Sequence, residues 1–172
     1  MMKIGLLSDS HRKVDLAKFC IDTLKKNGAQ LLLHAGDIVE EETLELLAKS
    51  TLEYKAVLGN NDMHLRGLMD KYELYPEPFN FIYKALHIKI MHHPYYLTPD
   101  ADLIVYGHTH YYEASVNGKR LFINPGEVCA RKKPLCECAL LHIKSQSWEI
   151  TRFTCKPEKR IWKTQTSTLN HA

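Results

Sequence analysis

The sequence predicts an α/β sandwich with two sheets and helices on the outside. In roughly the first sixty residues, short apolar runs alternate with segments of helical periodicity, which is typical of parallel strands joined by right-handed crossovers. In the second half, strand-like runs follow one another with short connections, which indicates mixed or antiparallel pairing. These two patterns together favour a pair of sheets within one domain.

The first half supplies three strands and two helices. The strands are expected at 4–7, 31–35 and 54–58, and the continuous apolar run at 4–7 indicates coverage on both faces. A first helix carries its apolar positions on one face, at Val14, Ala17, Ile21 and Leu24, and is expected to stop at Asn27-Gly28. A second helix, around residues 40–49, is expected to direct Leu44, Leu47 and Ala48 inward.

The second half supplies the remaining strands. They are expected at 80–83, 86–91, 103–106, 112–116, 120–123, 136–143 and 148–154. Asn117-Gly118 is a strong signal for a two-residue hairpin between two of them. Residues 156–172 lose apolar periodicity, so we expect a polar, poorly ordered tail after a domain of residues 1–155.

Composition excludes several classes of protein. The 172 residues are 45% hydrophobic and 25% charged, and no apolar run reaches the ~20 residues that a membrane span needs. The start of the chain resembles a first strand and not a signal peptide, so we expect a cytoplasmic protein. A net charge of only +3 gives no indication of nucleic-acid binding, and the sequence leaves a homo-oligomer open. Five cysteines without framework spacing indicate reduced thiols.

Polar side chains follow five of the predicted strands, at the point where each strand ends. They are Asp9 and His11, Asp37, Asn60, His92, and His108 and His110. Carboxyl ends of parallel strands meet at one edge of a sheet, where ligands bind. Taken singly, each motif has a plain interpretation as a helix N-cap or a turn. Their order along the chain, each after a strand, favours a common site.

The residue types at this edge are those of a metal centre. Imidazole with carboxylate suits Zn²⁺, Mn²⁺ or Fe²⁺, and the amide oxygen of Asn60 adds a neutral hard ligand. Seven candidate ligands exceed the four that one tetrahedral ion needs. We therefore expect two ions that share a bridging carboxylate, an arrangement that clamps a phosphate during in-line displacement.

These motifs resemble those of the calcineurin-like metallophosphoesterase superfamily. The likeness lies in Asp9-Ser10-His11, Gly36-Asp37, Gly59-Asn60, His92 and Gly107-His108-Thr109-His110, in that order. Residues 1 to about 155, including the loop Asn124-Pro125-Gly126, resemble its small single-domain bacterial and archaeal phosphodiesterases. The resemblance implies a four-layer α/β/β/α sandwich with two mixed sheets.

The resemblance also implies a role for each residue of the site. Asp9, His11 and His110 would hold one metal, and Asn60, His92 and His108 the other. Asp37 would bridge the two ions, while His34 matches a position that is not usually a ligand. The implied activity is that of a phosphodiesterase acting on a small phosphate ester. A hydroxide bridging the two ions would attack phosphorus in line, with Asp37 and Asn60 as catalytic residues. We expect Mn²⁺ first, with Zn²⁺, Fe²⁺ or Ni²⁺ as alternatives.

Several positions depart from the family's pattern. The histidine that often follows Gly-Asn is Asn61 here, which can donate a hydrogen bond but cannot protonate a leaving group. Arg12 and His93 replace glycines, so we expect Arg12, Asn61 and His93 to contact substrate. His93 also competes with His92 as a ligand, and alignment of the motif favours His92. Glu127 stands where the family often has serine.

Three other interpretations remain open from the sequence. The same fold includes a retromer subunit that serves chiefly as a protein-interaction surface, and the tyrosines of 72–75 and 95–96 could form such a surface. Cys129, Cys136, Cys138 and Cys155 could form a zinc or redox module, although Cys-x-Cys spacing favours buried thiols on one strand face. Within the enzymes, a phosphomonoesterase is the remaining alternative.

Overall fold

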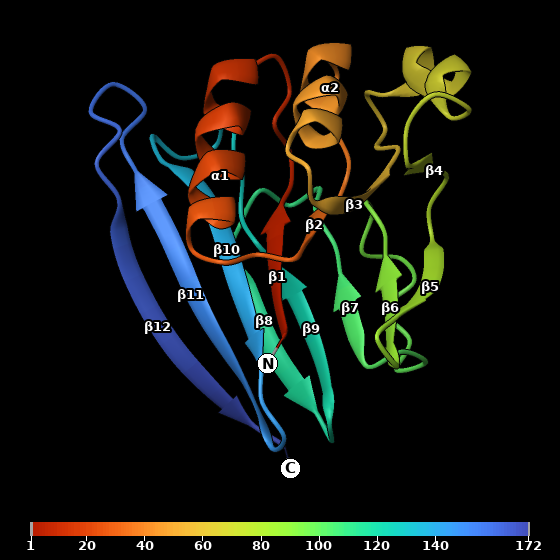
Figure 1. Ribbon diagram of the computed structural model, residues 1–172, viewed down its shortest axis with the longest axis vertical. Helices are drawn as coiled ribbons and strands as arrows, with labels where there is room; N and C mark the ends of the chain where they lie inside the picture. Colours follow the sequence, from red (N-terminus) through yellow and green to blue (C-terminus); the bar gives the residue numbers. More distant parts are fainter. Residues whose placement is uncertain (1, 172) are drawn as a thin grey trace.

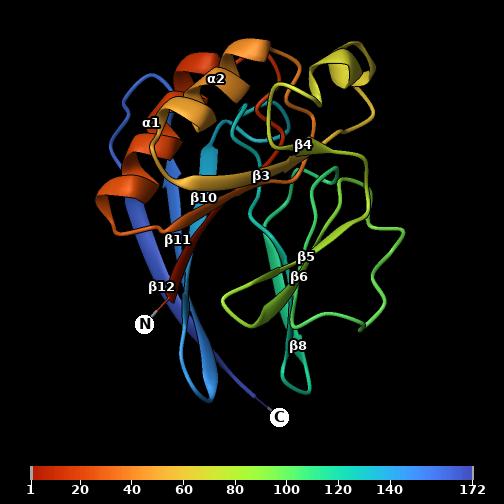
Figure 2. The ribbon, with the colours of Figure 1, turned by 45° about the vertical axis from the view of Figure 1, so that its right-hand side comes forward.

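Two mixed β-sheets pack face to face, and two helices cover the outer face of the larger sheet (Figure 1). This arrangement is seen in a computed structural model that describes residues 2–171. Figure 2 shows the same layers from the side, with the helices, the larger sheet and the smaller sheet in succession. The predicted α/β fold with two mixed sheets is confirmed.

The larger sheet has seven strands in the order β12-β11-β10-β1-β2-β3-β4. Its parallel part is the predicted β-α-β-α-β unit: β1 (Met2–Leu7), α1 (Val14–Lys26), β2 (Leu31–His34), α2 (Glu41–Lys49) and β3 (Glu53–Val57). The short β4 (Leu74–Tyr75) follows a 3-10 helix (Met63–Leu68) and pairs parallel with β3. On the other side of β1 lie three antiparallel strands: β10 (Cys136–Ile143), β11 (Ser147–Cys155) and β12 (Lys163–Asn170).

The smaller sheet has five strands in the order β5-β6-β7-β9-β8. Their bounds are β5 (Phe79–Tyr83), β6 (Leu86–Ile90), β7 (Leu103–Val105), β8 (Glu113–Asn117) and β9 (Arg120–Asn124). The central strands β6, β7 and β9 are parallel, whereas the outer strands pair antiparallel. The β8–β9 pair is the predicted hairpin, with Asn117 opposite Arg120. Each sheet therefore has parallel strands at its centre.

Alternation along the strands divides the apolar residues between two cores. In β2, Leu31 and Leu33 face the smaller sheet, and Leu32 faces the helices. Both cores are mostly aliphatic, so central strands such as β2 and β7 carry apolar residues on both faces. Gly5 of β1 lets α1 approach, because a Cβ there would lie 3.1 Å from the Cβ of Leu24 on α1 and 2.7 Å from a methyl group of Leu32 on β2.

The outer face of the smaller sheet is covered by a loop. Ile104 and Phe122 point outward from β7 and β9 and pack with Met91 and Ala101. Lys89 of β6 is buried beneath the same loop, where its ammonium group donates to Thr98 and Asp100, each at 2.7 Å. Segment 91–102 thus occupies the place of the expected fourth layer, and both α-helices of the described chain lie on the other side.

The C-terminal segment corrects a prediction. Residues 156–172 were expected to be poorly ordered, but β12 pairs with β11 along its whole length, from Ser147↔Asn170 to Thr154↔Lys163. Its side chains are almost all exposed, so the strand has no apolar alternation for a sequence pattern to detect. Thr164, Thr166 and Thr168 carry the β-branched preference for strands that apolar periodicity ignores.

Helix α2 differs from its prediction in one of its buried positions. Ala48 is exposed and not inward as predicted, while Thr43 is buried beside Leu44 and Leu47. All five cysteines are buried and unpaired, and Cys136 and Cys138 face the helices within one core, as their spacing predicted. Cys129 lies apart from them beside His110, so the four cysteines of the proposed zinc module do not form one cluster. Among residues 2–171, no helix is long and apolar enough to cross a membrane.

Candidate metal centre

The seven candidate ligands lie in loops that follow β1, β2, β3, β6 and β7. These loops meet where the parallel strands of both sheets end, just above the arrowheads of β1, β6 and β7 in Figure 1. Asp9 donates its backbone N–H to Gly36 at 3.0 Å, and His11 donates its own to Asp37 at 2.9 Å, which joins the first two loops. The structure therefore brings together all seven side chains that the sequence singled out.

The backbone at these positions is unusual. Five of the seven residues have positive φ angles: Asp9 (53°), His11 (45°), Asp37 (54°), His108 (67°) and His110 (67°). Non-glycine residues rarely adopt this region, and such strain gathers at functional sites, where it aims side chains. The turn after each strand thus directs its ligand toward the other loops.

Two motif glycines allow the loops to approach so closely. A Cβ on Gly59 would lie 2.3 Å from the backbone nitrogen of Asp37, and one on Gly107 would lie 2.1 Å from the hydroxyl of Ser8. Neither distance is sterically allowed. The glycines before Asn60 and His108 are therefore required by the proximity of the ligand loops.

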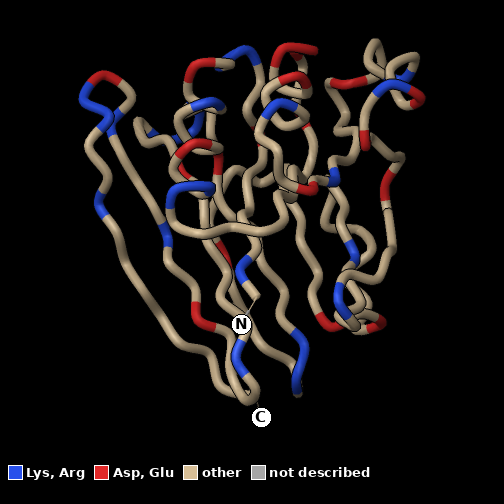
Figure 3. The backbone as a smooth tube through the Cα atoms, viewed as in Figure 1, with Lys and Arg blue, Asp and Glu red and all other residues tan. Residues whose placement is uncertain are grey.

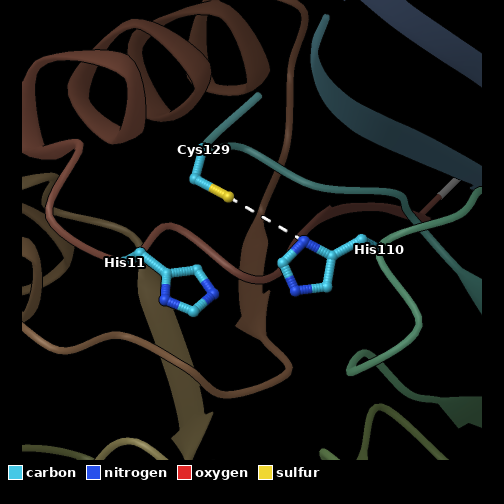
Figure 4. A group of neighbouring side chains, drawn as sticks. All are labelled: His11, His110 and Cys129. Atoms are coloured by element: carbon cyan, nitrogen blue, oxygen red, sulfur yellow. Dashed lines mark hydrogen bonds between the residues drawn. The ribbon is translucent and has the colours of Figure 1, made fainter. Parts of the chain in front are cut away.

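One group of ligands, here called site 1, consists of Asp9, His11 and His110. His110 Nε2 lies 3.2 Å from Asp9 Oδ1, and His11 Nε2 lies 4.0 Å from the same oxygen. The two imidazole rings face each other, with centroids 5.4 Å apart. Figure 4 shows them with the thiol of Cys129, whose Sγ is 3.9 Å from His110 Nδ1.

A second group, here called site 2, consists of Asn60, His92 and His108. His92 Nε2 lies 2.9 Å and His108 Nδ1 3.2 Å from Asn60 Oδ1, and the two nitrogens are 3.2 Å apart. His92 Nδ1 donates to the carbonyl of Ala35 at 2.9 Å, which fixes the ring and leaves Nε2 directed at Asn60.

Asp37 lies between the two sites. Its Oδ2 is 3.6 Å from His11 Nε2 in site 1 and 3.4 Å from His92 Nε2 in site 2. Asn61 donates its side-chain amide to the same oxygen at 2.8 Å and its backbone N–H to Oδ1 at 3.0 Å. One carboxylate oxygen is therefore shared by both groups, as a bridging ligand would be.

The donor set fits two divalent cations. Asp9 Oδ1 and His11 Nε2 are buried, yet they have no hydrogen-bond partner among the described residues. Buried polar atoms are normally paired, and an ion is one accepted explanation for an orphan. Both orphans belong to site 1, and each of the two sites offers imidazole nitrogens together with oxygen ligands.

The pKa values of the site reflect buried charges in close contact. Burial raises the pKa of Asp9 and lowers those of His11 and His108. Burial also opposes the charging of His92, but the carboxylates of Asp37 and Asp9 raise its pKa to about 9. For Asp37, hydrogen bonds from His92 and Asn61 outweigh burial and lower the pKa. A positive charge is thus favoured at His92, beside the carboxylate of Asp37.

Glu127 is a residue of the site whose role the sequence did not predict. It is fully buried, and its Oε2 lies 2.5 Å from His110 Nδ1. The backbone N–H groups of Lys132 and Lys133 and the thiol of Cys129 also donate to this carboxylate. Hydrogen bonds from His110 and these amides overcome burial and lower its pKa. His110 is thereby fixed with Nε2 toward Asp9, in the carboxylate–histidine pattern that supports metal-binding imidazoles.

His34 does not point into the ligand cluster. Its Nε2 bonds the hydroxyl of Ser10 at 2.9 Å, and its Nδ1 accepts the N–H of Gly36 at 3.2 Å. Burial lowers the pKa of His34 to about 3, so the ring is neutral. It supports the backbone between Asp9 and His11, in accord with the expectation that it is not a ligand.

The three residues expected to contact substrate lie on two sides of the cluster. Arg12 and Asn61 line an open pocket of about 620 Å³ next to His11. His93 lies on the site 2 side, where its Nδ1 is 2.5 Å from Glu77 and its ring stacks on Tyr95 at 4.9 Å. His93 has ring nitrogens near those of His92 and His108, but His92 contacts both Asn60 and Asp37, whereas the side-chain bond of His93 is to Glu77.

The fold and sequence are similar to those of known proteins. A phosphodiesterase of Methanocaldococcus jannaschii is 25% identical over 142 residues, covering 74% of this chain and 85% of that protein. A predicted phosphoesterase from Streptococcus pneumoniae superposes with a TM-score of 0.74 at 21% identity, covering 99% and 98% of the two chains. Vps29 from Entamoeba histolytica, solved with Zn²⁺, gives a TM-score of 0.69 at 20% identity, covering 98% and 99%.

A family model agrees with these similarities. The model of the calcineurin-like phosphoesterase superfamily domain matches residues 2–146, which include every candidate ligand and Glu127. The matched segment runs from β1 through β10 and extends to the turn before β11. On this match, the chain belongs to the calcineurin-like phosphoesterase superfamily.

Proposed function

We propose that the protein is a phosphodiesterase that uses two divalent cations, held by site 1 and site 2 and bridged by Asp37. The observation that carries the proposal is the position of Asp37 Oδ2, within 3.6 Å of an imidazole nitrogen from each site. Membership of a phosphoesterase family and similarity to a phosphodiesterase support the same chemistry. Mn²⁺ is the expected ion and Zn²⁺, present in the Vps29 structure, is the first alternative.

The chemistry divides between the cations and the chain. When bound, two such cations supply a water of lowered pKa for in-line attack and neutralise charge on the phosphoryl oxygens. Asp37 holds the two sites at a fixed separation, and Glu127 and Ala35 fix the rings of His110 and His92. Asn60 belongs to site 2, and Asn61 adjoins the open pocket, where its amide can donate to a phosphoryl oxygen.

The absence of a histidine at position 61 limits the substrates. Asn61 holds Asp37 through two hydrogen bonds and has no proton to give to a departing alkoxide. A leaving group with a low pKa needs no such proton. Diesters with activated leaving groups should therefore be cleaved readily, and unactivated alkyl esters slowly.

The test is turnover of bis-p-nitrophenyl phosphate with added Mn²⁺ by the wild type, Asp37→Asn and His110→Ala. Both variants should lose about two to three orders of magnitude in kcat/KM, because each removes a ligand that positions charge against the transition state. Asp22→Asn, an exposed position on α1, serves as the matched control and should retain full activity. Wild-type rates in both ligand variants would exclude the mechanism.

The same assay decides between two alternatives. Comparison of p-nitrophenyl phosphate with the diester under the same Mn²⁺ concentration distinguishes a monoesterase from a diesterase. A scaffold role is favoured by the exposed side chains of Tyr95, Tyr96 and Leu97, which neighbour one another in one loop. Metal-loaded protein that hydrolyses no ester, while binding two equivalents of Mn²⁺ by calorimetry, would support the scaffold instead.

A further inference from the structure

The charged side chains that line the open pocket beside site 1 are cationic. Its inner wall is formed by His11 and Asn61, which belong to or adjoin the ligand cluster. Its outer wall carries Arg12, Lys13 and Arg131. No carboxylate lines it among the described residues. A molecule whose phosphate lies at the two sites would therefore extend toward three cationic side chains.

Two of these three cationic side chains form no ion pair with another described residue. Lys13 and Arg131 have no carboxylate within 4.0 Å, and the one contact of Arg12 is with Glu40, at 3.8 Å from its Nε. Exposed cations around a concave surface, two of them without an ion pair to a described residue, are suited to an anionic ligand.

The backbone fixes these cations to the site 1 loops. Arg131 follows a segment in which the N–H groups of Val128 and Cys129 donate to Ser8 and Asp9, at 3.0 and 3.1 Å. Lys13 donates its backbone N–H to Ser10 at 3.0 Å. Both cationic segments are thus bonded to the turn that carries Asp9 and His11. Their distance from the site is set by the fold and not by a mobile loop.

The pocket is bounded on one side by His64. His64, whose Nε2 bonds the carbonyl of Val39 at 2.7 Å, forms the wall shared with a second hollow. That hollow is lined by Glu40, Glu41, Glu42 and Glu45 at the start of α2. Figure 3 shows both basic and acidic residues at the top of the view, where α1 and α2 begin. A long polyanion passing His64 would meet four carboxylates, so a compact anion is favoured over a nucleic-acid strand.

We propose that the pocket of Arg12, Lys13 and Arg131 binds a second phosphoryl group of a small phosphodiester whose scissile phosphate lies at the two sites. The inference rests on the proposed function and names its substrate class. Two guanidinium groups offer paired N–H donors that match phosphate oxygens, and Lys13 adds a point charge. A second anionic group placed in this pocket would orient the ester and lower KM.

The test compares two substrates that differ only in this group. One is the p-nitrophenyl ester of thymidine 5′-phosphate, and the other carries an additional phosphate on its 3′ hydroxyl. At low salt the second substrate should have about tenfold higher kcat/KM, since the added phosphate would form charge-assisted hydrogen bonds with the pocket. Arg131→Gln should bring this ratio close to one, and added salt should reduce it in the wild type.

The matched control is Arg120→Gln, an exposed arginine in the β8–β9 hairpin at the other end of β9 from the site, which should keep the wild-type ratio. A ratio near one in the wild type, or an unchanged ratio in Arg131→Gln, would overturn the proposal. A 3′-O-carboxymethyl analogue that outperforms the 3′-phosphate would also overturn the choice of a phosphoryl group.

A binding measurement distinguishes failure of the pocket proposal from failure of the proposed function. If neither ester is hydrolysed, calorimetry with Mn²⁺-loaded protein compares thymidine 3′,5′-bisphosphate with thymidine 5′-phosphate. Tighter binding of the bisphosphate that Arg131→Gln abolishes would support the pocket without catalysis. Equal affinities would exclude it.

Discussion

Site 1 and site 2 share Asp37 but differ in charge and in the way their ligands are held. Site 1 adds the carboxylate of Asp9, and its Asp9 Oδ1 and His11 Nε2 are buried without a partner. Site 2 adds only the neutral amide of Asn60, and its three side chains already bond one another. A cation that enters site 1 satisfies two orphaned atoms, whereas one that enters site 2 must displace existing hydrogen bonds.

The supports behind the two sites differ as well. Behind site 1 stands the buried carboxylate of Glu127, which bonds His110 directly. Behind site 2 the support is neutral or indirect. The Ala35 carbonyl bonds the ring of His92, and Glu77 bonds His92 through the backbone N–H and not through the ring. Greater negative charge and better preorganisation both favour a cation. Two sites with three protein ligands each are therefore not equivalent here, and we expect site 1 to bind its cation first and more tightly.

The largest effect should come from exchanging the charges of the two sites. In calorimetric titration with Mn²⁺, the wild type should show a tight and a weak phase. Asp9→Asn should weaken the tight phase by about a hundredfold, because ligand charge count governs the affinity of hard cations. Asn60→Asp should instead strengthen the weak phase. Loss of the weak phase in Asp9→Asn, with the tight phase intact, would reverse the assignment.

A smaller effect is expected from the supporting carboxylates. Glu127→Gln should weaken the tight phase by about ten- to a hundredfold, since loss of a carboxylate partner removes the charge that raises the basicity of His110. Glu77→Gln is the matched control on the other side and should alter only the weak phase. Glu127 would then be a positioning residue. Equal losses in both phases for Glu127→Gln would indicate a general folding defect, which a lowered Tm of the metal-free protein would reveal.

The seven candidate ligands could be located from the sequence because each follows a predicted strand. Strands β1, β2 and β7 were detectable from their apolar residues, and the motif order then implied where Asp9, Asp37 and His108 would lie. Parallel strands of two sheets ending at one edge bring these loops together. No periodicity argument beyond this was needed for the site.

The parts that the sequence did not predict are those set by contacts distant along the chain. Glu127 was noticed only as a departure from the family's pattern, because its bond to His110 spans 17 residues between two loops. The available sequence signal was a glutamate that directly follows Asn-Pro-Gly and precedes Cys129 by two residues. Strand β12 was missed because its residues are polar on both faces, and only pairing with β11 defines it. The expected outer helix was replaced by loop 91–102, which Lys89 holds through Thr98 and Asp100.

The smallest expected effect concerns His34, the neutral support of site 1. Its folded pKa of about 3 lies below the unfolded value of 6.5, so the unfolded chain binds a proton more readily between these values. Stability from this residue is therefore present above pH 6.5 and declines as the pH falls toward 3. Between pH 7 and pH 5 the loss should be about 2 kcal/mol.

The measurement is urea unfolding of metal-free protein, with His34→Gln as the comparison. Glutamine can still accept the N–H of Gly36 or bond the hydroxyl of Ser10, but it does not titrate. The stability of the wild type should therefore fall by about 2 kcal/mol more than that of His34→Gln between pH 7 and pH 5. Because both proteins keep every site 1 and site 2 ligand, the titration of His92 and the carboxylates cancels in the difference. Equal pH dependence in the two proteins would mean that His34 is not buried as a neutral ring, and that the turn of Asp9 and His11 lacks this support.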